Sequence, residues 1–190
     1  MKQFVRLLAT GKTVWNINDV HLFLWWTNKQ YTRLILHRMK KAWLLITPAP
    51  WIYCLPHYDR REFASKLRPW SYISCETVLV KDGILFQSYD NTVTLVSNNS
   101  VEKILEKKTY RYHKVHARIM SNPLGIINHE NKYLIASPER ALCDLIYLTK
   151  TMTVDNPKPL KTQLMLALAE IYNHSTQKRI YSFLAHAWLQ

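Results

Sequence analysis

The sequence predicts an α+β protein of two domains, a small basic N-terminal one and a larger one of mixed strands and helices. Helical patterns followed by a hairpin pattern fill residues 1–57, whereas strand-like runs and then helical patterns fill residues 70–190. Positive charge is concentrated at the start: residues 1–70 hold 12 Lys and Arg against 3 Asp and Glu, and residues 71–190 hold 14 against 10. With 48% hydrophobic and 21% charged residues, the composition is that of a folded protein.

The net charge of +13 at neutral pH points to a polyanionic partner, because a protein that neutralises phosphates releases the counterions condensed on them. A uniformly basic proteome would produce the same total, but it would not place most of the excess in the first third of the chain. The 3 glycines are too few for the glycine-rich loops that bind phosphates or dinucleotides. The 3 cysteines are widely spaced and form no CxxC pair, so we expect no disulfide framework, no metal site and no cofactor.

The chain shows no sign of a membrane segment. No apolar run approaches the roughly 20 residues of a membrane-spanning helix, so we expect no membrane partner. The start of the sequence has too short an apolar stretch for a secretory signal and lacks a small-residue cleavage site. These features are typical of a cytoplasmic protein.

The first 57 residues have the pattern of three short helices and a hairpin. Apolar residues at spacings of three and four mark a first helix, and a second helix that carries Val20, Phe23 and Leu24 and is capped by Asn16 or Asn18. Residues 43–47 and 51–55 are typical of two strands on either side of a proline-containing break. A helix-turn-helix followed directly by a hairpin is the winged-helix layout. We therefore expect a winged helix-turn-helix domain at residues 1–57 and a linker at residues 58–69.

The third helix, expected at residues 29–42, has a basic face. Its apolar residues recur at spacings of three and four and form the expected core stripe, which consists of Tyr31, Leu34, Ile35 and Met39. The charged side chains on the other face are all basic, and no acidic residue lies between Asp19 and Asp59. An ordinary solvated face usually mixes both signs of charge, whereas a basic amphipathic helix suits the major groove of DNA.

We therefore expect the third helix to read DNA bases. The hairpin is expected to pack, or to add one stacking contact through Trp51, because its Pro48-Ala49-Pro50 tip carries no Arg or Lys. Thr27 or Asn28 is the expected N-cap, with the helix N-terminus directed at a phosphate. The residues expected to contact double-stranded DNA are Thr27, Asn28, Lys29, Gln30, Tyr31, Thr32, Arg33, His37, Arg38, Lys41 and Trp51.

A second set of basic residues lies outside the third helix. Residues 110–119 alternate as in a strand, with one expected face formed by Tyr110, Tyr112, Lys114, His116 and Arg118. Tyrosines beside basic groups suit stacking on single-stranded RNA. The alternative to specific DNA recognition is therefore a protein- or RNA-interaction module that uses a secondary basic surface, expected at Arg60, Arg61, Arg111, Lys114 and Arg118.

Residues 70–190 are expected to form a mixed α/β domain. A short helix ending at Gly83 comes first. The strand-like runs that follow are residues 84–87, 92–96, 110–119, 125–129 and 132–136. The terminal helices are expected at residues 138–148, 160–174 and 177–188.

Two segments of this domain resemble motifs of a known family. Tyr72-Ile73-Ser74 introduces the short helix that ends at Gly83, and Ala136-Ser137-Pro138-Glu139-Arg140-Ala141-Leu142-Cys143-Asp144 opens a later helix. In this order, after an N-terminal winged helix, they resemble the AbiEi family, the antitoxins of type IV toxin–antitoxin systems in abortive phage infection. The similarity covers about residues 15–150, and the chain departs from it at the hairpin tip, which is often Gly-rich or Arg-rich in that family.

The resemblance implies a repressor that binds the promoter of its own operon. It also implies that the larger domain counteracts a nucleotidyltransferase toxin encoded beside it, without requiring a stable complex. At the start of the later helix, Arg140 precedes Asp144 by four residues, and the expected role is structural. The alternative is an anion site at that helix N-terminus.

No pattern of catalytic residues stands out. His113 and His116 would face opposite sides of a strand, which is poor geometry for a shared metal ion. Cys143 lies on an apolar helix face and is expected to be a buried structural residue. A nucleotidyltransferase requires a Gly-Ser pair followed by two nearby acidic residues that bind metal ions. None of the glycines, Gly11, Gly83 and Gly125, begins such a motif. We therefore predict a DNA-binding protein rather than an enzyme.

Overall fold

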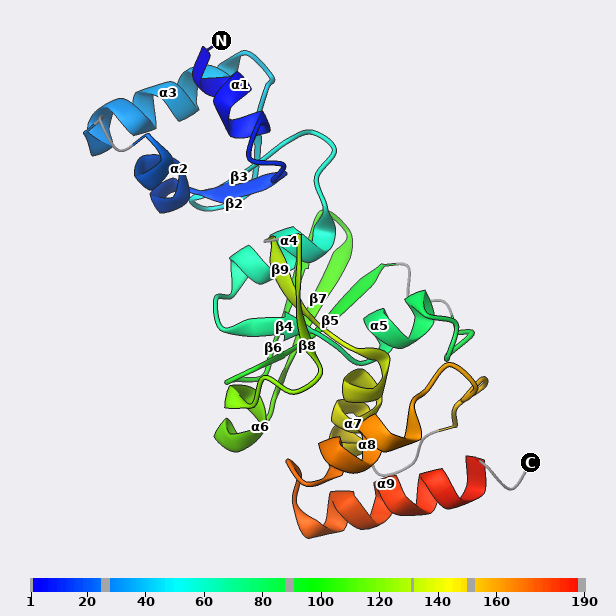
Figure 1. The fold of residues 1–190 in the computed structure, drawn as a ribbon. Coiled ribbons are helices and arrows are strands. Elements are labelled where there is room, and N and C mark those ends of the chain that lie inside the picture. Colours follow the sequence, from blue (N-terminus) through cyan, green and yellow to red (C-terminus); the bar gives the residue numbers. More distant parts are fainter. Residues whose placement is uncertain (1, 25–27, 88–90, 131, 150–152, 188–190) are drawn as a thin grey trace. The chain divides into compact units, whose positions relative to one another are not determined.

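The computed structural model describes residues 2–24, 28–87, 91–130, 132–149 and 153–187. As the sequence predicts, the chain is a mixed α+β protein (Figure 1). It divides into two compact units, Met1–Pro69 and Trp70–Gln190. Within the part of the chain that the structure describes, no helix combines the length and the apolar character needed to cross a membrane.

In its described residues, the first unit combines four helices with a three-stranded antiparallel sheet in the order β1-β3-β2. The helices are α1 (Lys2–Leu8), α2 (Ile17–Phe23), α3 (Lys29–Lys41) and α4 (Arg60–Leu67). The strands are β1 (Val14–Asn16), β2 (Ile46–Ala49) and β3 (Ile52–Cys54). The two-residue turn between β2 and β3 brings Ala49 opposite Ile52, and β1 pairs with the other edge of β3.

Local hydrogen bonds set both ends of α3. The Asn28 side chain accepts a bond from the backbone N–H of Tyr31 at 2.7 Å, so the predicted cap is confirmed at Asn28, while Thr27 lies outside the described residues. At the other end Trp43 has a φ of +57° and donates to the carbonyl of Lys40, and Leu44 donates to that of Met39. These two bonds form a Schellman motif. The strand predicted from residue 43 is therefore wrong at its start, because residues 42–44 close the helix.

The core of the first unit corrects the predicted stripe of α3. Its buried residues are Thr32, Ile35, Leu36 and Met39. Tyr31 and Leu34, which were expected inside, are each 42% exposed. The predicted stripe and the observed buried residues both have spacings of three and four. The observed buried side is rotated around the helix axis from the predicted one, so that Leu36 and not Leu34 faces the core.

Helix α4 packs within the first unit, in the segment that the sequence assigned to a linker. Its Glu62 is fully buried and accepts bonds from the N–H and Oγ1 of Thr13 at 2.8 and 2.7 Å. Lys66 of α4 pairs with Asp19 of α2 at 2.7 Å. Residues 60–67 therefore tie α4 to β1 and α2 by side-chain contacts.

The second unit is built on a six-stranded sheet in the order β6-β7-β5-β4-β9-β8. Its strands are β4 (Ser71–Ile73), β5 (Thr92–Ser97), β6 (Val101–Leu105), β7 (Lys108–Lys114), β8 (Ile126–His129) and β9 (Tyr133–Ala136). Its helices are α5 (Glu76–Lys81), α6 (Ala117–Ser121), α7 (Pro138–Leu148), α8 (Thr162–Ala169) and α9 (His174–Ala187). The β4–β9 and β5–β7 pairs are parallel and the others antiparallel.

Two strand predictions in this unit are corrected, and one strand was missed. The run expected at residues 110–119 ends as β7 at Lys114, because His116 caps α6 by accepting a bond from the N–H of Arg118 at 3.3 Å. Residues 84–87 form no strand, since the carbonyl of Ile84 accepts bonds from the backbone N–H groups of Asp155 and Asn156. Strand β6 was not predicted, and its middle residues are exposed, as is usual at a sheet edge.

Candidate nucleic-acid interface

The outward side of α3 carries most of the residues that the sequence singled out. Its exposed side chains are Lys29, Gln30, Tyr31, Arg33, Leu34, His37, Arg38, Lys40 and Lys41. With 100° between successive residues, Gln30, His37 and Lys41 lie directly opposite the core, and Leu34 lies among them. The centre of this face is therefore polar and basic around one exposed apolar side chain.

No nearby carboxylate compensates this charge. The three acidic residues of the first unit are engaged elsewhere: Asp19 pairs with Lys66, Asp59 caps α4, and Glu62 is buried against Thr13. Among the described residues no ion pair includes a side chain of α3. The positive field of α3 is thus open to solvent and to a ligand.

The turn between β2 and β3 places an aromatic ring beside this helix. Trp51 is 60% exposed, and the Arg33 guanidinium carbon lies 5.8 Å from its ring centroid. This distance is within the range of a cation–π contact. Pro50 precedes Trp51, whose φ of +64° is normally adopted by glycine at this position of a turn. A bulky residue held in this conformation is under backbone strain, and such strain is often found at functional sites.

A small hollow lies between α2 and α3. It has a volume of about 90 Å³ and is lined by Ile17, Asn18, His21, Lys29, Thr32 and Arg33. Two of these side chains are cationic, and the hollow lies at the N-terminal end of α3. Its size and charge suit a single phosphate group.

The structure moves one expected contact off the outward side of α3 and adds two exposed candidates. Thr32 is fully buried, its hydroxyl donates to the carbonyl of Asn28 at 3.2 Å, and it lies in the wall of the hollow rather than on the outward side of α3. Leu34 was missed because it was placed in the core stripe. Trp43 is exposed at the end of α3 and was missed because it was placed in a strand. The remaining expected residues of α3 are exposed.

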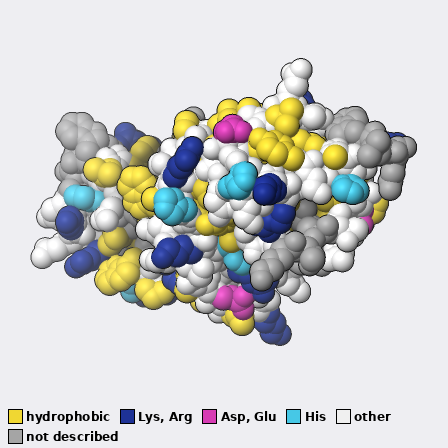
Figure 2. Space-filling view, turned by 90° about the horizontal axis from the view of Figure 1, so that it is seen from below, with side chains coloured by type: hydrophobic (Ala, Val, Ile, Leu, Met, Phe, Trp, Pro, Cys, Tyr) yellow, Lys and Arg dark blue, Asp and Glu magenta, His cyan; other side chains and the backbone are white. Residues whose placement is uncertain are grey.

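The secondary basic surface is not one continuous strand face. Arg60 and Arg61 belong to the first unit and the other three members to the second. Arg111 pairs with Glu102 at 2.8 Å, and Arg118 donates to the carbonyl of Glu170 at 3.1 Å. On the face shown in Figure 2, Lys, Arg and His side chains lie among hydrophobic ones and few acidic ones.

The tyrosines of β7 are not available for stacking. Tyr110 and Tyr112 are buried in the second unit. The sequence expected them beside Lys114 on a surface that could bind single-stranded RNA. Because a base cannot reach a buried ring, this part of the expectation is wrong.

The Arg140–Asp144 pair lies at the centre of the second unit. Both side chains are fully buried, and Arg140 Nε is 3.4 Å from Asp144 Oδ1. The guanidinium also donates to Tyr72 Oη at 3.2 Å and to the carbonyls of Ile119 and Leu124 at 2.6 and 2.8 Å. This arrangement joins α7 to β4 and to the segment around α6.

Three hydroxyl groups complete the same network. Tyr72 and Ser74 donate to Asp144 Oδ2 at 3.0 and 2.8 Å, and Tyr172 donates to Oδ1 at 2.7 Å. Burial raises the pKa of Asp144 above its ordinary value, while Arg140 and the three hydroxyl donors act in the opposite direction. The network uses both carboxylate oxygens, as expected of a structural element.

The groups that could suggest catalysis have other roles. Burial raises the pKa of the Cys143 thiol well above its ordinary value, which keeps it protonated and poorly nucleophilic. Glu139 accepts a bond from the backbone N–H of Lys161 at 3.1 Å. Within the described ranges, no three His, Cys, Asp or Glu side chains are grouped in a way that could hold a metal ion.

Comparisons with known proteins give distant structural matches, one of which is to a mycobacterial protein. No family model matches the chain, and no curated protein matches it. The crystal structure of the RV2827C protein from Mycobacterium tuberculosis is similar with a TM-score of 0.49 at 9% identity, covering 96% of this chain and 72% of that one. At this level the similarity carries no argument about function.

Proposed function

We propose that the first unit is a winged helix-turn-helix domain and that the chain is a DNA-binding transcriptional repressor. The order α1-β1-α2-α3-β2-β3, with β1 paired to the outer edge of the hairpin, supports the domain assignment. The observation that carries the function is the uncompensated basic side of α3, next to the exposed, strained Trp51. Binding to DNA is consistent with a location in the cytoplasm.

Helix α3 has the dimensions and chemistry of a recognition helix. Its 13 residues span about 20 Å and fit a major groove about 12 Å wide. Arg33 offers a bidentate donor for guanine, and Gln30 offers the donor and acceptor that pair with adenine. Leu34 supplies an apolar group for the thymine methyl. The hollow beside Lys29 is the proposed position of a backbone phosphate.

Binding of the full chain to the DNA upstream of its own gene tests the proposal. We expect a gel shift that survives an excess of random duplex and weakens with salt, because phosphate contacts release counterions. The variant Arg38→Gln/Lys41→Gln should weaken binding and reduce the salt slope by about 2. The control Lys81→Gln/Lys103→Gln removes the same charge from exposed sites of the second unit and should change neither. Equal losses in both variants would indicate a nonspecific polyelectrolyte effect and contradict the proposal.

Replacing Trp51 by glycine should separate stability from binding. Glycine adopts a φ of +64° without backbone strain, which stabilises the folded state, whereas its greater conformational freedom stabilises the unfolded state. Because the two effects oppose each other, we expect the free energy of unfolding to change by less than about 1 kcal/mol. The affinity for DNA should fall several-fold, because the ring beside Arg33 is lost. Urea unfolding and gel shifts measure the two effects.

The matched control for this variant is Trp70→Gly. Trp70 has a φ of +62° and is 83% exposed, but it belongs to the second unit. It should show the same small change in stability with unchanged DNA affinity. If Trp51→Gly bound DNA like the wild type, the turn would not take part in binding.

The resemblance to the AbiEi antitoxins extends the proposal to the second unit. We propose that this unit counteracts a cognate nucleotidyltransferase toxin, a role that does not require a stable complex between the two proteins. The motif residues on which the resemblance rests, Tyr72, Ser74, Arg140 and Asp144, belong to one buried network of hydrogen bonds and an ion pair. Co-expression with the nucleotidyltransferase encoded beside the gene tests it, and rescue of growth by the full chain is the expected result.

A further inference from the structure

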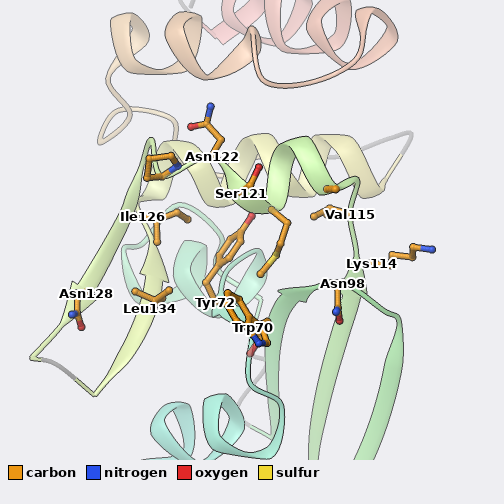
Figure 3. Close-up of a pocket in the computed structure, with 14 residues that line it drawn as sticks. Trp70, Tyr72, Asn98, Lys114, Val115, Ser121, Asn122, Ile126, Asn128 and Leu134 are labelled. Carbon is orange, nitrogen blue, oxygen red and sulfur yellow. The ribbon is translucent and has the colours of Figure 1, made fainter.

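The second unit contains a large hollow that the proposed DNA contacts do not use. It has a volume of about 890 Å³, within the range of small-molecule sites, and its surface is mostly apolar. Every residue that lines it lies between Trp70 and Leu134, inside the second unit. In Figure 3, Trp70 and Tyr72 lie between Ile126 and Leu134 on one side and Val115 on the other, with α6 above them.

Part of the wall of the hollow is held in place by packing and hydrogen bonds. Tyr72, Ser71 and Val115 are buried residues of the sheet or of the segment directly after β7. The Tyr72 hydroxyl is fixed by Asp144 and Arg140 at 3.0 and 3.2 Å, so its ring forms a preorganised aromatic surface. A preformed apolar wall binds an apolar ligand without the cost of ordering side chains.

The rim adds an exposed aromatic ring and polar groups. Trp70 holds its side chain 83% exposed at a φ of +62°, a conformation that strains a bulky residue. Asn98, Asn128 and Ser121 are also exposed lining residues. These groups can hydrogen-bond one polar end of a ligand whose body lies on the aromatic and aliphatic surface.

Among the described residues that line the hollow, Lys114 alone is charged. Its side chain is exposed and extends outward from the rim in Figure 3. No hydrogen bond or ion pair among the described residues involves its ammonium group, so the flexible four-carbon stem can turn over the opening at little cost. The charge that complements this rim is negative.

We propose that this hollow binds a small, mostly apolar molecule that carries one anionic group, with the apolar body against Tyr72 and Trp70 and the anion at Lys114. The inference is independent of the proposed DNA contacts, because none of its residues belongs to the first unit. It assigns to the second unit a ligand site as well as its proposed role against a toxin.

Two fluorescent probes of nearly the same shape test the ligand class on the full chain. Anilinonaphthalene sulfonate has an aromatic body and one anionic group, and phenylnaphthylamine has the same body without it. We expect the wild type to bind both and to prefer the sulfonate. Lys114→Gln should weaken sulfonate binding about tenfold, the equivalent of one charge-assisted hydrogen bond, and leave the neutral probe unchanged.

The controls locate the site and exclude misfolding. Lys103→Gln removes an exposed lysine of β6 outside the hollow and should bind both probes like the wild type. Ala117→Trp fills the hollow from α6 and should weaken both probes at least tenfold. Because partly folded proteins also bind the sulfonate probe, near-UV circular dichroism must show that each variant keeps its tertiary structure. Equal affinity for the two probes, or unchanged sulfonate binding by folded Lys114→Gln, would overturn the proposal.

Discussion

Replacing Asp144 by alanine is expected to lower the free energy of unfolding by about 3–5 kcal/mol. The change removes the counter-charge of the fully buried Arg140. It also leaves the hydroxyls of Tyr72, Ser74 and Tyr172 without the acceptor that they share in the folded protein. An uncompensated buried charge and lost hydrogen bonds both penalise the folded state, and solvent cannot reach the site to compensate. Urea unfolding followed by circular dichroism measures the loss.

An exposed ion pair of the same unit provides the matched control. Arg111 and Glu102 lie 2.8 Å apart on neighbouring strands, but both side chains are over 40% exposed. Glu102→Ala should therefore cost less than about 1 kcal/mol, because solvent replaces the lost partner. The double variant Arg140→Met/Asp144→Leu should be more stable than Asp144→Ala, since it leaves no charge buried. Similar small losses for Asp144→Ala and Glu102→Ala would contradict a buried charged network.

Short-range pattern predicted the three helices and the hairpin of the first unit but missed strand β1, and it did not fix which side of α3 is buried. The order of helices and hairpin and the cap at Asn28 follow from spacing and local hydrogen bonding, which depend on neighbouring residues. The buried side of α3 could not be fixed in the same way. Tyr31 and Leu34 satisfy the helical period as well as Thr32 and Leu36 do, and only packing against the rest of the core selects between them.

Contacts between distant residues explain what the sequence could not show in the second unit. The spacing of Arg140 and Asp144 predicted that they could pair on one helix. Their remaining partners come from positions 72 and 74 and from position 172, which no periodicity connects to α7. The hollow above Tyr72 has the same origin, because its residues meet only when β4, β8, β9 and α6 come together. The alternation of residues 110–119 was misleading because the capping by His116 replaces the strand with a helix.

Arg33→Ala is expected to weaken the preference of the full chain for its operator by about 1–3 kcal/mol, if Arg33 pairs with a guanine. Arg33 is exposed on α3 and its guanidinium lies over the ring of Trp51, which holds the side chain on the outward side of the helix. Alanine keeps the helix, so the loss should appear in binding and leave the free energy of unfolding nearly unchanged. Competition gel shifts with operator and random duplex measure the discrimination.

The pattern of loss distinguishes two roles for this arginine. A base contact predicts that operator binding falls while binding to random duplex is nearly unchanged, so discrimination collapses. A phosphate contact predicts equal losses on both duplexes and a salt slope reduced by about 1. Lys29 and Arg33 both line the small hollow between α2 and α3. Lys29→Ala should therefore weaken binding to both duplexes equally, as expected of a phosphate contact. Equal losses on both duplexes for Arg33→Ala would mean that Arg33 contacts the DNA phosphates and positions the domain. Base recognition would then be assigned to Gln30 and His37 at the centre of the exposed face of α3.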